Sequence, residues 1–428
     1  MKKILINKTE LNERIERNFC RLREPYYDID HIFSPLEYDW YGDKEGRALL
    51  AFVSHYAIHG RKIPCMEKML DDIPKKTNKY YFFGDTDTDI INEQQLSGHN
   101  WYLRGLLSHY EIFSDERILN YAKSTVENLY LPIKEKLFAY PTENIEKEGG
   151  VSGKSCVIKS GWKLSSDTAC VFMCIDGLSH YYEISHDNRV LDLLYEFHKL
   201  FIMVDKVKIK AQTHCCLSAC RGFIRLYKTM GDDIFLKTAK ELFNLYISSG
   251  MTLTYQNYNW WGKGNTWTEP CAVIDSIMVS TELFKITGDT EYQRLSARIW
   301  HNGFAAMQVG NGGAGTTTTV NSTQHYLNTI MYEAEFCCTM RLAEGLRYIS
   351  ENSEYIIAVE EALAKDDSGR YMCGDFIYAE ILSDEVLSDY IDFSRSIRID
   401  GLNLLPLVKY YNLPKNVTDR IKQKIIFL

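Results

Sequence analysis

The sequence lacks a long run of basic residues, and it has no apolar stretch of the length needed to cross a membrane. Its net charge of −8 disfavours nucleic acid or an anionic membrane as the main partner, because either one favours a basic protein surface. The first residues, MKKILINKTELNER, begin with basic side chains but contain no apolar segment long enough for the core of a signal peptide. With 45% apolar and 25% charged residues, the chain has the composition of an ordinary globular protein.

The cysteines lack the regular spacing of a disulfide framework. There are 12 of them, and many stand inside apolar helical phrases: Cys170, Cys174, Cys215, Cys216 and Cys220. This usage is typical of a reducing compartment, where free thiols serve as small core residues or as metal ligands. We therefore expect a cytoplasmic protein.

What the chain does contain is a repeated helical phrase, in which an apolar helix meets a short polar break and then a second helix. Four copies are clear: HYEIFSDERIL (109–119), HYYEISHDNRVL (180–191), LYKTMGDDIFL (226–236) and LFKITGDTEYQRL (283–295). The break recurs in HYAIHGRK (55–62), and a sixth apolar segment begins at Cys337 without a clear second helix. The breaks lie about 45 to 72 residues apart, which is the spacing of helix pairs.

Six helix pairs predict an all-α fold, an (α/α)6 toroid. The apolar member of each pair would form the inner wall, and the amphipathic partners, which open with Asp at or near the cap, would form the outer layer. A ring can hold more residues than one ordinary layered core, because its core is spread around the circle. We assign residues 1–355 to this domain and residues 356–428 to a C-terminal extension without an assigned role.

Polar and thiol groups precede the predicted inner helices, so a toroid would gather them on one rim. They are Asp43, His99, Asp167, His214, Glu269 with Cys271, and Cys337 with Cys338. Taken singly, His99 and His214 are ordinary polar wall residues, and Asp43 and Asp167 are ordinary helix caps. Together they predict a functional site.

Two of these motifs suit a metal ion. WTEPCAV places Glu269 and Cys271 two residues apart at the start of the fifth inner helix, and FCCTM places Cys337 and Cys338 at the start of the sixth. Three thiolates and one carboxylate suit tetrahedral Zn²⁺ rather than Mg²⁺ or Ca²⁺. The competing interpretation is that vicinal cysteines are core residues, as we expect for the rival pair Cys215 and Cys216.

These motifs, with the helical breaks LYKTMGDD and LFKITGDT, resemble the catalytic domain of glycoside hydrolase family 127, the β-L-arabinofuranosidases, over about residues 40–350. The resemblance implies an (α/α)6 barrel, a Zn²⁺ held by Glu269, Cys271, Cys337 and Cys338, and Cys337 as the nucleophile. It also implies a retaining glycoside hydrolase with a small arabinofuranoside-like carbohydrate as substrate.

The chain departs from that family in one catalytic role. The family's acid/base is a Glu upstream of the E-x-C motif, yet residues 250–268 contain no Asp or Glu. Glu333, Glu335 and Asp167 are the candidate substitutes. The substrate would also meet His99, His214 and aromatic rings around the funnel, namely Trp40, Tyr41, Trp101, Trp260, Trp261 and Trp267.

Two alternatives stay open at this point. One is a catalytically inactive sugar-binding or scaffold toroid, which the vacant acid/base position favours. The other is a different zinc-dependent toroid enzyme, such as a lanthionine-type cyclase, although the adjacent pair His214-Cys215 has the reverse of the expected order. The glycine-rich stretch GNGGAGTTTT (310–319) lacks the Lys-Ser/Thr of a phosphate-binding loop, and we expect a plain loop there.

Overall fold

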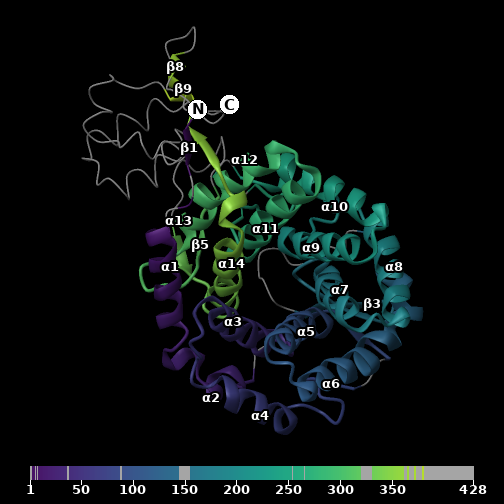
Figure 1. Cartoon of the computed structure of the whole chain (residues 1–428). Coiled ribbons are helices and arrows are strands. Elements are labelled where there is room, and N and C mark those ends of the chain that lie inside the picture. Colours follow the sequence, from purple (N-terminus) through teal and green to yellow (C-terminus); the bar gives the residue numbers. More distant parts are fainter. Residues whose placement is uncertain are drawn as a thin grey trace.

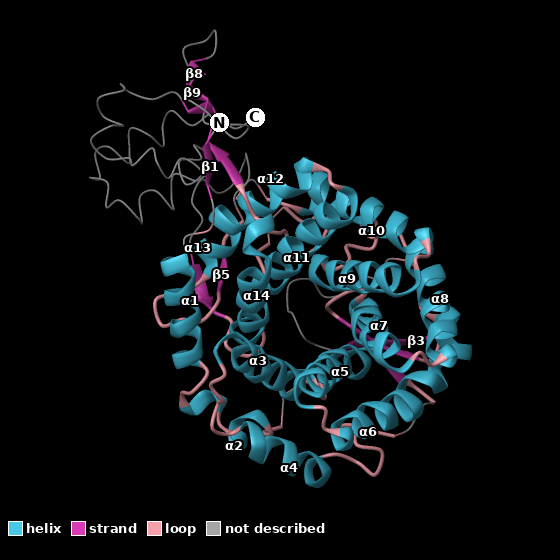
Figure 2. Cartoon of the chain, viewed as in Figure 1, coloured by secondary structure: helices cyan, strands magenta, loops and turns pink. Residues whose placement is uncertain are grey.

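The computed structural model describes residues 2–4, 6, 8–35, 38–86, 89–143, 155–252, 254–264, 266–319 and 330–360, with three two-residue strands beyond them. Figures 1 and 2 show two concentric layers of helices. No helix among these residues is long and apolar enough to cross a membrane. The described part ends shortly after the ring, so the domain boundary at residue 355 stays a prediction.

Six helices form the inner layer. They are α3 (Asp43–His59), α5 (Glu93–Phe113), α7 (Cys174–Ser185), α9 (Thr213–Met230), α11 (Pro270–Thr287) and α14 (Cys338–Asn352). Each packs against the next along the chain, and α14 packs against α3, which closes the ring (Figure 1). The prediction of an (α/α)6 toroid is therefore confirmed.

The outer layer also has six helices, which are α1 (Lys8–Arg21), α4 (Met66–Lys76), α6 (Glu116–Thr125), α8 (Asn188–Met203), α10 (Asp233–Leu245) and α12 (Thr290–Arg298). Short helical segments connect or extend the helices of both layers: η1 (Pro25–Tyr27), α2 (Ile29–Ile32), η2 (Val126–Tyr130), η3 (Leu131–Ala139), η4 (Cys170–Met173), η5 (Tyr246–Gly250), η6 (Ile299–Phe304), α13 (Ala305–Met307) and η7 (Ser353–Tyr355).

The polar breaks in the sequence are the corners between inner and outer helices. Each of four inner helices ends at a residue with left-handed backbone, as at Gly231 (φ 75°) and Gly288 (φ 72°). The next residue is an Asp whose carboxylate accepts a hydrogen bond from the first turn of the outer helix, as Asp232 does from the N–H of Ile234. A left-handed stop followed by an Asp cap turns the chain back within two residues.

The sixth outer helix comes from the other end of the chain. The sequence shows no second helix after the sixth inner one, and α1 fills this place by packing against α14. Asn18 on α1 donates to the Thr339 carbonyl (3.1 Å), and its side-chain oxygen lies 2.9 Å from His55 Nε2 on α3. The N-terminal helix thus joins the first and last inner helices.

The strands form small sheets outside the two helical layers. Strands β3 (Ser155–Lys159) and β4 (Trp162–Ser165) form a hairpin, and β2 (Ile91–Asn92) pairs with β4. The tight turn between β3 and β4 has positive φ at Ser160 (53°) and Gly161 (79°), as such two-residue turns require. The remaining strands are β1 (Lys2–Ile4) with β7 (Ala358–Glu360), and β8 (Ala364–Lys365), β9 (Tyr371–Met372) and β10 (Tyr378–Ala379).

The expectation of a plain loop at residues 310–319 was wrong. Residues 315–317 form strand β5 (Gly315–Thr317), which pairs with β6 (Ile330–Glu333). Thr316 and Thr317 are buried, and the two hydroxyls of Thr317 and Thr268 lie 2.6 Å apart. Threonine suits a strand, and these hydroxyls find partners inside the protein, so this segment supports the loop that precedes α11.

Candidate metal centre and active site

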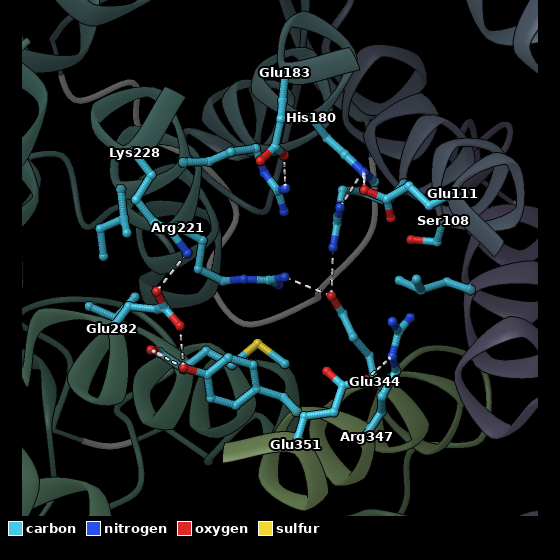
Figure 3. A pocket seen from close by; sticks show the side chains of 17 residues that line it. Ser108, Glu111, His180, Glu183, Arg221, Lys228, Glu282, Glu344, Arg347 and Glu351 are labelled. Carbon is cyan, nitrogen blue, oxygen red and sulfur yellow. Dashed lines mark hydrogen bonds and ion pairs between the residues drawn. The ribbon is translucent and has the colours of Figure 1, made fainter. Parts of the chain in front are cut away.

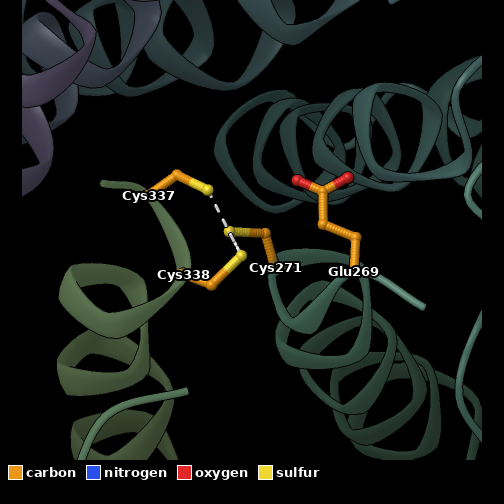
Figure 4. Close-up of side chains that lie close together, drawn as sticks. All are labelled: Glu269, Cys271, Cys337 and Cys338. Atoms are coloured by element: carbon orange, nitrogen blue, oxygen red, sulfur yellow. Dashed lines mark hydrogen bonds between the residues drawn. The ribbon is translucent and has the colours of Figure 1, made fainter. Parts of the chain in front are cut away.

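The four predicted metal ligands meet at the rim (Figure 4). Their ligand atoms, from Glu269, Cys271, Cys337 and Cys338, all lie within 4.8 Å of one another. The Cys271 and Cys338 sulfurs are 3.4 Å apart, and those of Cys337 and Cys338 are 3.3 Å apart. Two neighbouring inner helices supply the whole set, since α11 packs directly on α14.

Local backbone geometry explains why the E-x-C motif can present both side chains. Glu269 has extended backbone (φ −115°, ψ 116°) immediately before α11, and Pro270 begins the helix. Pro suits this first position because the helix needs no N–H there. The Glu269 N–H is bound by the side-chain oxygen of Asn257 at 2.8 Å, which fixes the residue before the helix starts.

This donor set fits zinc. On a tetrahedral Zn²⁺ with Zn–S bonds of about 2.3 Å, neighbouring donor atoms lie about 3.8 Å apart. The observed separations between the sulfurs are close to this value, and thiolate sulfur is the donor that Zn²⁺ prefers over harder cations. A carboxylate supplies the fourth donor.

The three thiols differ in acidity. Hydrogen bonds from Cys271 and Cys338 lower the pKa of Cys337 to about 5, although burial opposes this change. Burial raises the pKa of Cys271 and Cys338. The hydrogen bonds from its two neighbours therefore favour the thiolate form at Cys337.

A fixed guanidinium lies next to the thiols. Arg47 on α3 places Nη1 3.4 Å from the Cys271 sulfur and makes two hydrogen bonds with Asp43, of 2.8 and 3.0 Å. It lies over the ring of Trp101, 4.1 Å from the centroid. Burial raises the pKa of Asp43, and Arg47 opposes that rise. Asp43 therefore holds Arg47 in place and does not cap the helix, since Gly42 occupies the cap position.

Glu269 is held on its other side by two polar groups. His214 Nδ1 lies 3.1 Å from one carboxylate oxygen, and the Gln212 amide donates to the other at 3.2 Å. His214 Nε2 lies 3.5 Å from Asp275, although neither imidazole contact has the angle of a hydrogen bond. Burial lowers the pKa of His214, but the charges of Glu269 and Cys271 outweigh burial and raise it. The row Glu269, His214, Asp275 runs from the rim into the ring.

Asp167 and His99 differ in their relation to the cluster. Asp167 is buried on the loop after β4, and its neighbour Thr168 accepts a hydrogen bond from the Gln212 backbone. Asp167 therefore lies next to Gln212, whose side-chain amide binds Glu269. His99 is fully buried, and its two ring nitrogens contact the Phe83 N–H (2.9 Å) and the Gln95 carbonyl (2.7 Å). We assign His99 to the wall of the ring.

The aromatic rings that were predicted to contact the substrate also differ in how deeply they are buried. Trp101 and Trp261 are fully buried, whereas Trp267 is half-buried and packs edge-on against Trp260, with ring centroids 4.9 Å apart. Trp40 is buried at 8% exposure, and Tyr41 is exposed. Trp267, two residues before Glu269, is therefore more exposed than Trp101, Trp260 or Trp261.

Two of the three candidate acid/base carboxylates, Glu333 and Glu335, are paired with Arg21. Glu333 accepts from Arg21 (2.9 Å), Asn311 (2.7 Å) and Thr339 (3.0 Å), and only 14% of its side chain is exposed. Glu335 also pairs with Arg21, but 40% of its side chain is exposed. Glu335 is therefore the more exposed of the two carboxylates.

Arg47, Gln212, Asp275 and Tyr332 lie at or near the cluster but are not among the residues predicted from the sequence. Arg47 follows Asp43 by four residues, so an (i, i+4) ion pair could have been expected there. Tyr332 on β6 is 53% exposed. Burial and the charges of Cys337, Cys338 and Glu269 raise its pKa, although a hydrogen bond with Thr316 opposes the rise. Nothing in the sequence marks a tyrosine five residues before the vicinal cysteines.

Comparisons with known proteins agree with this geometry. Residues 65–363 match the family described as "Beta-L-arabinofuranosidase, GH127 catalytic domain". A search of the curated proteins finds no match.

Solved structures with the same fold include a GH127 β-arabinofuranosidase (TM-score 0.56, 12% identity), of which this chain covers 66% with 90% of its own length. A GH127 β-L-arabinofuranosidase from Geobacillus stearothermophilus T6 is similar at TM-score 0.51 and 12% identity, covering 87% of this chain and 69% of that one. A cellobiose 2-epimerase from Bacillus thermoamylovorans B4167 matches at TM-score 0.51 and 13% identity, over 81% of this chain and all of the other. The chain spans less than two thirds of the first two glycoside hydrolases that it matches, 66% and 59%.

Proposed function

Because this chain belongs to glycoside hydrolase family 127, we propose that it cleaves an arabinofuranoside-like glycoside with retention of configuration, using Cys337 as the nucleophile. The observation that carries this proposal is the meeting of three thiols and one carboxylate, from two neighbouring inner helices, within 4.8 Å. Family membership supports a glycoside hydrolase, and the acidity of Cys337 supports its role in attack.

The reaction has two displacements. In the first, the Cys337 sulfur bonds to the anomeric carbon while the glycosidic C–O bond breaks, and an acid donates a proton to the leaving oxygen. In the second, water attacks the same carbon, a base takes its proton, and the sulfur leaves as thiolate. Two inversions at one carbon give overall retention.

Glu269, Cys271, Cys337 and Cys338 would hold a zinc ion, which when bound supplies the positive charge that keeps thiols ionised at neutral pH. Arg47 adds a fixed positive charge beside Cys271, and Asp43 keeps that charge in position. His214 and Gln212 orient the Glu269 carboxylate.

For proton transfer we propose Glu335, ahead of Glu333. Glu333 is held by three partners and points toward α1, whereas the Glu335 carboxylate has Arg21 as its one described partner and stands two residues before Cys337. Asp167 is the third candidate, because it borders the Gln212 side of the cluster. On the sugar-binding side we propose Trp267 and Trp260, with His214 at the base of the funnel.

The proposal can be tested with reduced, zinc-loaded protein and 4-nitrophenyl β-L-arabinofuranoside. We expect turnover by the wild type and by Cys216→Ala, a buried thiol outside the cluster, and none by Cys337→Ala. A haloacetamido-arabinose should label Cys337 in peptide mapping. Label on Cys338, Cys215 or Cys216 would refute Cys337 as the nucleophile.

A second candidate function is sugar binding without catalysis. It is favoured by the absence of Asp and Glu from residues 250–268 and by the multiple partners of Glu333. Sugar binding with no hydrolysis across a panel of aryl arabinofuranosides would support it. The lanthionine-type cyclase has no such support, since the chain matches a glycoside hydrolase family.

A further inference from the structure

A cavity lies inside the ring (Figure 3), and none of the cysteines of the candidate metal centre lines it. It encloses about 220 Å³, and all six inner helices contribute to its walls. Its lining residues stand six or more positions after the start of their helices, as do Glu344 on α14 and Val279 on α11. With a rise of 1.5 Å per residue, this places them about 9 Å or more beyond the helix starts that carry the cysteines. None of the four metal ligands touches it.

The cavity wall is charged but balanced. Five basic side chains (Arg104, Arg221, Arg225, Lys228 and Arg347) face five acidic ones (Glu111, Glu183, Glu282, Glu344 and Glu351). They are paired around the circle. Glu344 accepts from Arg104 at 2.8 Å and from Arg221 at 2.6 Å (Figure 3), and Lys228 pairs with Glu282 at 2.9 Å.

This balance of paired charges excludes a simple ion as the ligand of the cavity. An anion or cation site needs an excess of the opposite charge, and here each charge already has a partner on the wall. The same argument removes a metal ion at Glu111, His180 and Glu183, whose ligand atoms come close together. Arg104 contacts His180 Nδ1 and Arg225 pairs with Glu183, so positive charge already occupies that corner.

The balanced pairs suit a neutral ligand with adjacent hydroxyl groups. Each pair offers a donor and an acceptor side by side, as the two hydroxyls of a sugar do. Arg225 Nε is buried and has no hydrogen-bond partner among the residues that the structure describes, so a donor remains for a ligand to satisfy. Between the charges the wall is apolar, formed by Leu50, Ile224, Met278 and Val279 with the ring of Tyr348, and such a surface can cover the C–H face of a sugar.

We propose that this cavity is a second binding site for a neutral monosaccharide, separate from the cysteine centre. The site goes beyond the proposed hydrolase function and does not depend on it, because it uses none of the metal ligands. Carbohydrate binding at both ends of the lumen would let the ring hold a sugar where no hydrolysis takes place.

The test is calorimetry and saturation-transfer NMR on the full-length chain, with L-arabinose as the probe. Val279→Trp should fill the cavity and weaken binding at this site at least tenfold. Ile224→Phe, a smaller filling, serves as the second variant if Val279→Trp does not fold, as judged by circular dichroism. Cys337→Ala and Trp267→Ala alter the rim, and they should leave the binding of L-arabinose in the cavity unchanged.

Unchanged L-arabinose binding in a folded cavity-filling variant would overturn the proposal. The proposal would also fail if phosphate or glycine bound more tightly than L-arabinose and the cavity-filling variant abolished that binding. The ligand of the cavity would then be charged. Failure of aryl arabinofuranoside hydrolysis would count only against the cysteine mechanism, since the NMR readout here needs no turnover.

Discussion

The guanidinium of Arg47 lies 3.4 Å from the sulfur of Cys271, on a helix 224 residues earlier in the chain. Both are buried. Arg47 is in turn held by a two-bond ion pair with Asp43 and by the face of Trp101. The thiol cluster is therefore built against a fixed positive charge from α3, the helix that packs on α14.

Replacing Arg47 should lower the free energy of unfolding, and a second substitution should restore part of the loss. Arg47→Met leaves the buried Asp43 carboxylate without a partner, for which we expect a loss of about 3–5 kcal/mol in the free energy of unfolding. The double variant Asp43→Leu/Arg47→Met removes both charges and should recover part of this loss. The exposed pair Arg61–Glu16 offers a matched control, and Arg61→Met should cost at most about 1 kcal/mol. Urea unfolding measures all three, and a double variant no more stable than Arg47→Met would contradict the argument.

Zinc content should depend on Cys271 and not on other buried thiols. Elemental analysis of reduced protein should find about one zinc per chain in the wild type and in Cys216→Ser, and a large loss in Cys271→Ser. A ligand at a thousandfold excess over its Kd stabilises the native state by about 4 kcal/mol, so a chelator should lower the Tm of the wild type but not of Cys271→Ser. Full zinc in Cys271→Ser would remove this residue from the ligand set.

Substitution of Trp261 should mainly lower stability, whereas substitution of Trp267 should mainly lower the affinity for a sugar. Sequence analysis predicts a sugar contact for both, but the Trp261 ring is fully buried and packs against Gly250, whereas Trp267 is half-buried. Trp261→Ala should lose about 3–5 kcal/mol of stability through the cavity it leaves. Trp267→Ala should keep most of the stability and weaken sugar binding about tenfold. A large loss of affinity in folded Trp261→Ala, with none in Trp267→Ala, would reverse the assignment.

Buried histidines should make the protein sensitive to acid. Burial lowers the pKa of His99 from 6.5 to about 4, although a hydrogen bond to the Gln95 carbonyl opposes this. Below pH 6.5 the unfolded chain therefore binds a proton that the folded chain refuses, so stability is full above pH 6.5 and is lost as the pH falls toward 4. One such group contributes a slope of about 1.4 kcal/mol per pH unit, or about 2 kcal/mol between pH 7 and 5.

The variant His99→Gln tests this. It should be less stable than the wild type at pH 7 but should lose about 2 kcal/mol less on acidification to pH 5, measured by urea unfolding. His186→Asn, at the exposed end of α7, is the control and should follow the wild type. Parallel pH profiles for the wild type and His99→Gln would show that His99 does not carry the effect.

The helix pairs could be predicted from the sequence because their signals are local. A left-handed residue followed by an Asp cap, as at Gly288 and Asp289, is a property of a few consecutive residues. The E-x-C and Cys-Cys motifs are local in the same sense, since each stands at the start of one helix. Apolar inner helices also predict a ring, because a helix that is apolar on most sides must be covered on most sides.

The closure of the ring and the surroundings of the cluster were decided by tertiary structure. No local pattern shows that α1 covers α14, that Arg47 reaches Cys271, or that Glu344 binds Arg104 and Arg221 across the lumen. Each of these contacts joins segments more than 100 residues apart, and each depends on the angle at which helices meet around the circle. The sequence by itself determined which side chains stand at the helix starts. Only the packing of the six inner helices determined which of those side chains share a site, because the distance between two helix ends is set by every helix between them.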